Sequence, residues 1–395
     1  EEQMAVKKLI DEIFWVGAED WDRRLFDSLI PLPEGTSYNA YIVQGKNLTV
    51  LIDAVDPTKK DVLESHLNEF PKIDLVIANH LEQDHSGLIP YVLNRYPQAR
   101  LLATPAARDL IITHLHIAED RIKTVTDGER LDLGGRTIRF VHFPWVHWPE
   151  TMLSYLEEDK ILFSCDLFGS HLASSDLMVK DEERIYEPAK RYFAEIMMPF
   201  RKIIQKNLPV VEGLEVKVVA PSHGPIYARS AFIIDAYKKW VDDQPENSVL
   251  IAWASMHGST ARMVDHLICE LAGRGIKVMP FNLAVTDLGH LAMSLVEAAT
   301  IIVASPTILT GLHPLVAEAV FLVNALRPKA LFAGFIGSYG WKSRALDQLK
   351  SMLDSVRFEL LNPVQIKGDP RPEDLTLLSK LVDEIYQKHQ TAGLF

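Results

Sequence analysis

The part of the sequence after residue 248 constrains the fold most, because short apolar runs there alternate regularly with stretches of helical periodicity. The apolar runs are Val249–Ala254, Lys277–Asn282, Thr300–Ser305, Lys329–Ile336 and Phe358–Ile366. The helical stretches include Ala261–Ala272, Pro314–Leu326, Lys342–Ser355 and Pro372–Lys388. Strand–helix alternation at this spacing predicts a parallel sheet with right-handed crossovers and helices on both faces. We therefore predict a doubly wound α/β sheet of five strands, which binds ligands at the carboxyl ends of its strands.

The residues before 249 follow a different pattern, in which strand-like runs are mixed with hairpin turns and a few helices. Leu133-Gly134-Gly135-Arg136 has the composition of a hairpin turn, and helices are expected near Lys59–Glu69 and Leu88–Tyr96. The strand-like runs are Tyr38–Val43, Leu48–Asp53, Leu75–Ala78, Leu101–Ala103, Thr137–Phe143, Thr151–Tyr155, Lys160–Ser164 and Val216–Ala220. This mixture predicts two packed sheets with helices outside, an αββα sandwich.

A polar stretch with one proline, Asp242–Ser248, separates the two patterns. A chain of 395 residues is also too long for one domain of the usual ~100–200 residues. We predict a first domain of residues 1–248 and a second, flavodoxin-like domain of residues 249–395.

Composition narrows the classes of function. The net charge is −12 and no basic run interrupts the acidity, so nucleic acid and anionic membrane surfaces are not expected as partners. Only two cysteines are present, Cys165 and Cys269, without a C-x-x-C motif, which argues against a disulfide scaffold and cysteine-ligated metals. Any metal must therefore be held by His, Asp and Glu. The N-terminus Glu1–Lys8 mixes charges and no apolar run approaches ~18 residues, so we expect a cytoplasmic protein.

Four potential metal ligands, His80, Glu82, Asp84 and His85, lie within six residues after the expected strand Leu75–Ala78. Any one of them alone could be a solvated loop residue. Packed together, however, two imidazoles and two carboxylates are hard to desolvate unless a cation lies between them. Three further candidates follow other expected strands: His147, Asp166 and His223. Histidines and carboxylates delivered from four strand ends predict a two-metal site.

These motifs resemble those of the flavodiiron proteins, whose first domain has a metallo-β-lactamase-like fold. The resemblance covers nearly the whole chain and rests on His80-x-Glu82-x-Asp84-His85, His147-Trp148-Pro149, Cys165-Asp166 and Ser222-His223-Gly224. Zinc hydrolases of this fold carry His-x-His-x-Asp-His. A carboxylate at Glu82 adds negative charge and a hard oxygen donor, which favours iron over zinc.

The resemblance implies two iron sites with three ligands each: His80, Glu82 and His147, and Asp84, His85 and His223. Asp166 would bridge the two irons. In some relatives the histidine equivalent to His85 points away from its iron, and water takes its place. His171 is expected to line the substrate pocket as a catalytic residue that supplies protons or hydrogen bonds, with a structural role as the alternative. His142 competes with His147, but its alternating context favours a hydrogen-bonded strand histidine.

A hydroxyl-rich loop follows the strand Val249–Ala254 and leads into the helix expected from Ala261. Backbone N–H groups, hydroxyls and a helix N-terminus can bind a phosphate without a cation. Because the loop lacks a P-loop lysine, it favours flavin mononucleotide (FMN) over a nucleoside triphosphate, although its hydroxyl residues could also be mere N-caps. The loop residues are Ser255, Met256, His257, Gly258, Ser259 and Thr260.

Two more loops stand at strand ends where a flavodoxin-like fold holds an isoalloxazine ring. They comprise Pro306, Thr307, Ile308, Leu309, Thr310 and Gly311, and Ser338, Tyr339, Gly340 and Trp341. All three loops resemble the FMN loops of flavodiiron proteins. The sequence contains no Gly-x-Gly-x-x-Gly, which argues against a Rossmann dinucleotide site.

The resemblance implies an oxidoreductase that reduces dioxygen to water, nitric oxide to nitrous oxide, or both. Electrons would pass through FMN from an external donor, a rubredoxin-like protein or a reduced deazaflavin coenzyme, because we expect no fused rubredoxin or NAD(P)H-flavin reductase domain after Phe395. A head-to-tail homodimer, alone or as a dimer of dimers, would bring FMN near the partner's irons. The alternatives are a metallo-β-lactamase-like hydrolase with a regulatory flavodoxin-like domain, and a redox sensor or electron carrier without turnover. Iron with FMN would support the first reading, zinc the second, and flavin without metal the third.

Overall fold

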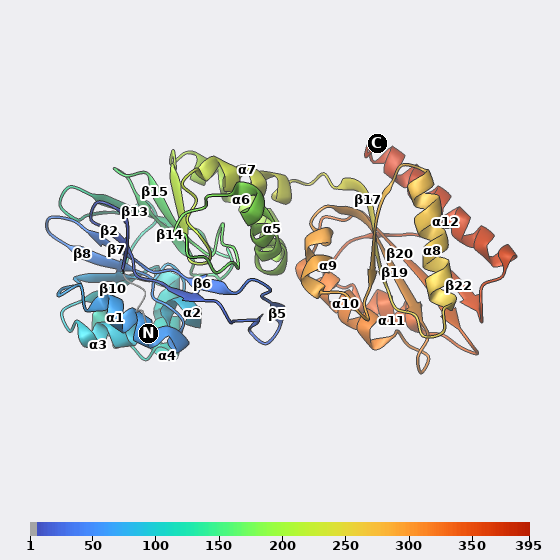
Figure 1. The fold of residues 1–395 in the computed structure, drawn as a ribbon, viewed down its shortest axis with the longest axis horizontal. Coiled ribbons are helices and arrows are strands. Elements are labelled where there is room, and N and C mark those ends of the chain that lie inside the picture. Colours follow the sequence, from blue (N-terminus) through green and yellow to red (C-terminus); the bar gives the residue numbers. More distant parts are fainter. Residues whose placement is uncertain (1–5) are drawn as a thin grey trace. The chain divides into compact units, whose positions relative to one another are not determined.

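The computed structural model describes residues 6–395, which divide into two compact units (Figure 1). The first comprises the chain up to Phe193 together with Phe200–Val241, and the second comprises Ala194–Pro199 and Asp242–Phe395. The first five residues, on which part of the expectation about targeting signals rests, lie outside the described residues. Within residues 6–395, no helix is both long and apolar enough to span a membrane.

Two large sheets form the centre of the first unit. The seven-stranded sheet has the order β1-β2-β7-β8-β9-β10-β11, with β1 Lys7–Ile10, β2 Ile13–Trp15, β7 Tyr41–Gln44, β8 Thr49–Ile52, β9 Leu75–Ile77, β10 Arg100–Ala103 and β11 Ile122–Thr124. The five-stranded sheet has the order β12 Arg130–Asp132, β13 Thr137–His142, β14 Met152–Leu156, β15 Ile161–Cys165 and β16 Val218–Pro221. Two small hairpins pair β3 Ala18–Asp20 with β6 Thr36–Tyr38, and β4 Leu25–Phe26 with β5 Ile30–Pro31.

Alternation along the strands divides the apolar side chains of the first sheet between two cores. Ile52 and Ile77 pack against Phe140 and Phe163 of the second sheet. Leu51 and the other side chains of the opposite face pack against the helices α1 Lys60–Leu67, α3 Ile89–Arg95 and α4 Arg108–His114. Figure 1 shows these helices beside the first sheet, and α6 Arg201–Glu212 and α7 Ser230–Val241 beside the second. The αββα prediction is confirmed.

The second unit contains one sheet whose strand pairs are all parallel, in the order β18-β17-β19-β20 followed by β21 and β22. Its strands are β17 Glu246–Trp253, β18 Lys277–Asn282, β19 Ala298–Pro306, β20 Phe332–Tyr339, β21 Glu359–Leu360 and β22 Val364–Lys367. The helices α8 Ser259–Gly273 and α12 Pro372–Thr391 cover one face (Figure 1), and α9 Leu288–Leu295, α10 Pro314–Leu326 and α11 Ala345–Met352 cover the other. The doubly wound prediction is confirmed.

The edge of this sheet differs from the expected single strand over Phe358–Ile366. Two short strands, β21 and β22, occupy the fifth position and both pair with β20. The break between them contains Pro363, which has no backbone N–H to donate to a ladder. The strand expected from Val249 begins three residues earlier, at Glu246, and α9 lies where the sequence analysis assigned no helix.

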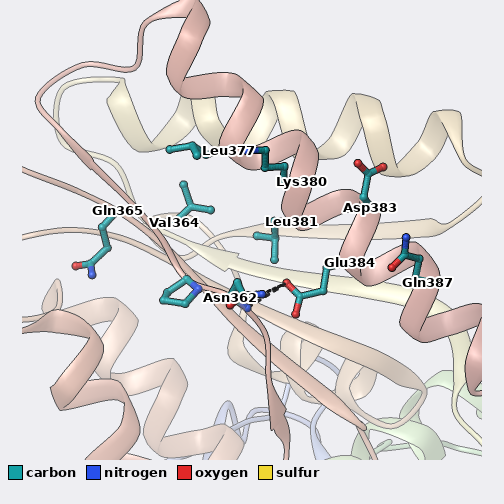
Figure 2. A pocket seen from close by; sticks show the side chains of 10 residues that line it. Asn362, Val364, Gln365, Leu377, Lys380, Leu381, Asp383, Glu384 and Gln387 are labelled. Atoms are coloured by element: carbon teal, nitrogen blue, oxygen red, sulfur yellow. Dashed lines mark hydrogen bonds between the residues drawn. The ribbon is translucent and has the colours of Figure 1, made fainter.

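A groove of about 600 Å³ lies where the chain entering β22 passes α12. The side-chain amide of Asn362 donates a hydrogen bond to Oε2 of Glu384 at 3.1 Å. Figure 2 shows this bond, with Lys380, Asp383 and Gln387 on the helix side of the groove. None of the predicted FMN residues lines this groove. It is therefore separate from the ligand-binding edge of the sheet.

Candidate metal site

The predicted metal ligands all follow strands of the first unit at their carboxyl ends. His80 lies just beyond β9, and Glu82 is the N-cap of the single-turn helix α2 Gln83–Ser86, which carries Asp84 and His85. His147 lies between β13 and β14, Asp166 directly follows β15, and His223 follows β16. The carboxyl ends of these particular strands lie close together, so the seven side chains form one cluster.

Asp166 lies at the centre of this cluster, and its two carboxylate oxygens face different groups. Oδ2 lies 3.2 Å from Nε2 of His147 and 3.5 Å from Nε2 of His80. Oδ1 lies 3.0 Å from Nε2 of His85 and 3.4 Å from Nε2 of His223. The seven candidates therefore form two ligand sets that meet at one carboxylate.

The other two carboxylates, those of Glu82 and Asp84, each belong to one of the two sets. Oε2 of Glu82 lies 3.0 Å from Nε2 of His147 and 3.3 Å from Nε2 of His80. Oδ2 of Asp84 lies 3.1 Å from Nε2 of His223, and its Oδ1 lies 3.4 Å from Nε2 of His85. The ring of His85 thus points into the cluster.

Several buried atoms of the cluster lie close to one another but not in hydrogen-bond geometry, so they have no hydrogen-bond partner. They are both carboxylate oxygens of Asp84, Oδ1 of Asp166 and both ring nitrogens of His85. A buried polar atom without a partner costs about 1–3 kcal/mol, and more when it is charged. Cations bound between these atoms would remove that cost, so the donor set fits a pair of metal ions.

The electrostatics of the cluster point the same way. Burial by itself would lower the pKa of His147, but Asp166 and Glu82 outweigh it and raise the pKa to about 10. Burial would raise the pKa of Glu82, yet His147 and His80 hold it below its usual range. The carboxylates therefore draw protons onto the histidines, and bound cations would take over the role of those protons.

Asn79 and Glu150, which the sequence analysis did not single out, hold the His80 loop. Asn79 is buried and its backbone N–H donates to Oδ1 of Asp53 at 2.8 Å. Oε1 of Glu150 accepts hydrogen bonds from Nδ1 of His80 at 2.8 Å and from the backbone N–H of Leu81 at 3.1 Å. The sequence offered one signal for the role of Glu150, which is that it follows the candidate ligand His147 by three residues.

His171 is buried beside the second ligand set, with its ring centroid 5.2 Å from that of His223 and 4.8 Å from that of Tyr192. Nδ1 contacts the hydroxyl of Thr36 at 3.0 Å, and Nε2 is buried without a partner. Burial, with a smaller contribution from the charge of His223, lowers the pKa of His171 well below its usual range. His171 is therefore neutral.

His142 is not part of the cluster. It lies in β13, and its Nε2 pairs with the backbone carbonyl of Val125 at 3.1 Å. The expectation of a hydrogen-bonded strand histidine is confirmed. Of the two histidines, only His147 belongs to the cluster.

The three predicted FMN loops also meet, at Ser338. The Ser338 hydroxyl lies 3.0 Å from the hydroxyl of Ser259 and 3.4 Å from that of Thr260. The backbone N–H of Thr307 donates to the carbonyl of Ser338 at 2.9 Å. A groove of about 460 Å³ runs beside the second loop, lined partly by Leu309, Thr310 and Gly311.

The first of these loops leads into the N-terminus of α8, which Ser255 caps only in part. Gly258 occupies the N-cap with φ +92°, a conformation that favours glycine, and it offers no capping side chain. The hydroxyl oxygen of Ser255 instead accepts hydrogen bonds from the backbone N–H groups of Gly258 at 3.2 Å and Ala261 at 3.3 Å. Met256 and Trp341 are exposed. The other N–H groups of the first turn and the loop hydroxyls fit a phosphate, and the exposed Trp341 fits a flavin ring.

Comparison with known proteins identifies the family. A family model described as "ODP family beta lactamase" matches residues 36–224, which include all seven candidate metal ligands. A nitric oxide reductase of Moorella thermoacetica is 33% identical over 93% of this chain and 94% of its own length. The structure of rubredoxin oxygen:oxidoreductase from Desulfovibrio gigas matches with a TM-score of 0.92 at 27% identity and covers 98% of this chain and 99% of that one. The flavodiiron protein of Giardia intestinalis matches with a TM-score of 0.88 at 25% identity, covering 98% and 97%. The chain therefore belongs to the flavodiiron protein family.

Proposed function

We propose that this protein is an oxidoreductase that reduces dioxygen to water, nitric oxide to nitrous oxide, or both, using two iron ions and FMN. The observation that carries this proposal is the placement of Asp166 between two sets of ligands. Residues 1–248 would form the di-iron domain, and residues 249–395 would form the FMN domain. The nitric oxide reductase of M. thermoacetica and the oxygen-linked name of the D. gigas protein support both gases as candidate substrates.

We propose that the two ligand sets hold one iron each. The first set is His80, Glu82 and His147, the second is Asp84, His85 and His223, and Asp166 bridges them. When bound, the iron pair supplies a binding place for a diatomic molecule and a change of oxidation state, and FMN supplies electrons one at a time. The chain's carboxylates balance the positive charge of the metals inside a buried site.

Glu82 is the residue that favours this activity over hydrolysis. Its Oε2 lies 3.0 Å from His147 and 3.3 Å from His80, so its carboxylate takes part in the first set. The zinc hydrolases of this fold have an imidazole at that position of the motif. An anionic oxygen donor there favours iron.

The wall beside the second set is aromatic and suits a small, weakly polar gas. Phe26 lies 5.6 Å from His171 and 6.2 Å from His223 between ring centroids, and Tyr192 lies 5.7 Å from His223. Since His171 is neutral and its Nε2 has no protein partner, we propose that it offers a hydrogen bond to bound substrate. The one hydroxyl proton of Thr36 faces two acceptors, Nδ1 of His171 at 3.0 Å and the backbone carbonyl of Ser37 at 3.3 Å; donation to Nδ1 would leave the ring proton of His171 on Nε2.

We propose that an external donor, a rubredoxin-like protein or a reduced deazaflavin coenzyme, reduces the FMN. The rubredoxin in the name of the D. gigas protein supports the first of these donors. Because the metal ligands and the FMN loops belong to different units of the chain, we propose a head-to-tail homodimer in which each FMN serves the partner's irons. We also propose that two such dimers can associate and that the protein is cytoplasmic.

The decisive experiment combines composition with turnover. The protein is purified without oxygen, its iron, zinc and FMN are measured, and the reduced protein is then supplied separately with dioxygen and nitric oxide. We expect iron and FMN, with consumption of at least one gas. Zinc in place of iron, or iron and FMN without consumption of either gas, would refute the proposal.

A further inference from the structure

Glu150 connects the two loops that carry the histidines of the first ligand set. It follows His147 by three residues, and its side chain contacts His80 and the next backbone N–H, that of Leu81. The side chain is buried, and Oε2 has no hydrogen-bond partner. Its backbone carbonyl accepts a hydrogen bond from the Thr104 hydroxyl at 2.9 Å. A carboxylate so enclosed interacts with His80 and with little else.

The contact with Glu150 fixes which nitrogen of His80 faces the metal set. Nδ1 lies 2.8 Å from the carboxylate and therefore carries the proton that it donates. The lone pair then remains on Nε2, which lies 3.3 Å from Glu82 and 3.5 Å from Asp166. A carboxylate bonded to the far nitrogen also makes an imidazole a stronger metal ligand.

The histidines of the second set lack this support. Nδ1 of His223 lies 2.7 Å from the backbone carbonyl of Ser37, which is uncharged. Nδ1 of His85 is buried without a partner. His80 is therefore polarised by a carboxylate through its far nitrogen, whereas neither histidine of the second set is.

We propose, building on the di-metal site of the proposed function, that Glu150 is a positioning residue that makes the first ligand set the tighter metal site. It acts through His80 and does not touch the metal itself. Loss of its charge would weaken metal binding at the first set alone. Loss of such an outer carboxylate typically costs about 10- to 100-fold in metal affinity.

The test uses single-site backgrounds and Co²⁺ as the probe, under argon and in competition with a chelator. The variant H223A leaves the first set intact, and H147A leaves the second. Adding Glu150→Gln, which keeps an acceptor but removes the charge, is expected to weaken Co²⁺ binding about 10-fold or more in the H223A background. In the H147A background the change is expected to stay below about threefold.

A matched control separates polarisation of His80 from general damage to the loop. Thr104→Val removes the hydrogen bond to the Glu150 backbone and keeps the carboxylate, so it should change Co²⁺ affinity in neither background. Equal weakening in both backgrounds, or the same loss in the Thr104→Val control, would overturn the role of Glu150. If Glu150→Gln changes neither affinity, the proposal is also wrong, while the di-metal site stands. A chain that binds no Co²⁺ in any form would overturn this inference together with the proposed function.

Discussion

Substitution of Asn79 by alanine tests how the structure holds the metal ligands in place. Asn79 precedes His80 and is bonded to both sheets of the first unit. Its side-chain amide donates to Oδ2 of Asp53, beyond β8, at 3.1 Å, and its Oδ1 accepts from the hydroxyl of Ser154 in β14 at 2.8 Å. Its backbone carbonyl accepts from the N–H of Met152 at 2.9 Å. The side chain therefore ties the two sheets together next to the site.

The expected cost follows from the two side-chain bonds that alanine removes. The bond to the Asp53 carboxylate is worth about 1.5–3 kcal/mol, and the neutral bond from Ser154 about 1 kcal/mol. The Ser154 hydroxyl is buried and loses its partner, which adds to the cost. We expect Asn79→Ala to lower the free energy of unfolding of the first unit by about 3–5 kcal/mol.

Urea unfolding of the metal-free protein, combined with hydrogen exchange of peptides from β9 and β14, measures this loss. The matched control is Ser154→Ala, which removes the neutral bond, leaves Oδ1 of the buried Asn79 without its donor and should cost about 1–3 kcal/mol. In the double variant the two losses should not add, because both include the bond between these residues. If Asn79→Ala costs no more than Ser154→Ala, the reasoning about the tie between the sheets is refuted.

Three other perturbations test separate parts of the molecule. Glu82→His should raise the ratio of zinc to iron in purified protein, measured by elemental analysis, because it removes the anionic oxygen donor; an unchanged ratio would show that this carboxylate does not set the preference. Thr260→Val should weaken FMN binding about 10-fold in a flavin fluorescence titration, as expected for one lost phosphate hydrogen bond, and unchanged affinity would argue against the phosphate loop. His389 is buried against Thr300, and burial lowers its pKa to about 4. Its contribution to stability should be full above its unfolded pKa of about 6.5 and be lost as the pH falls toward 4, by roughly 2 kcal/mol after allowance for solvent screening. Urea unfolding from pH 7 to pH 4 should show a smaller loss for His389→Gln than for the unchanged protein, and equal losses would contradict this assignment.

The parts of the fold that the sequence predicts well are those encoded by local patterns. Lys277–Asn282 and Pro314–Leu326 are a strand and a helix with the expected bounds, because period and end signals lie within each segment. The edge strand could not be predicted in the same way. Pro363 within Phe358–Ile366 is a sequence signal for a break, but only the pairing with β20 shows that two short strands share this edge of the sheet.

The cluster of candidate metal ligands was predictable for a chemical reason. A metal site requires imidazoles and carboxylates, and these side chains are conspicuous when they follow apolar strands, as His80 and Asp166 do. The contact of His171 with Thr36, by contrast, joins residues 135 positions apart. No local pattern carries that information, so the prediction for His171 could name a pocket but not its partner.

The residues that support the ligands leave still weaker traces in the sequence. The group that orients His223 is the backbone carbonyl of Ser37, and every residue of the chain has such a carbonyl. Glu150 orients His80, but a glutamate after a proline is indistinguishable from a surface residue until the β13–β14 loop is seen against the loop after β9. Which residues can be ligands depends on side-chain chemistry, and the sequence shows it. How strongly a ligand is polarised depends on which group lies against it in the folded chain, and the sequence does not show that. Two metal sites with similar ligands can therefore differ in strength for reasons that become visible only when the chain is folded.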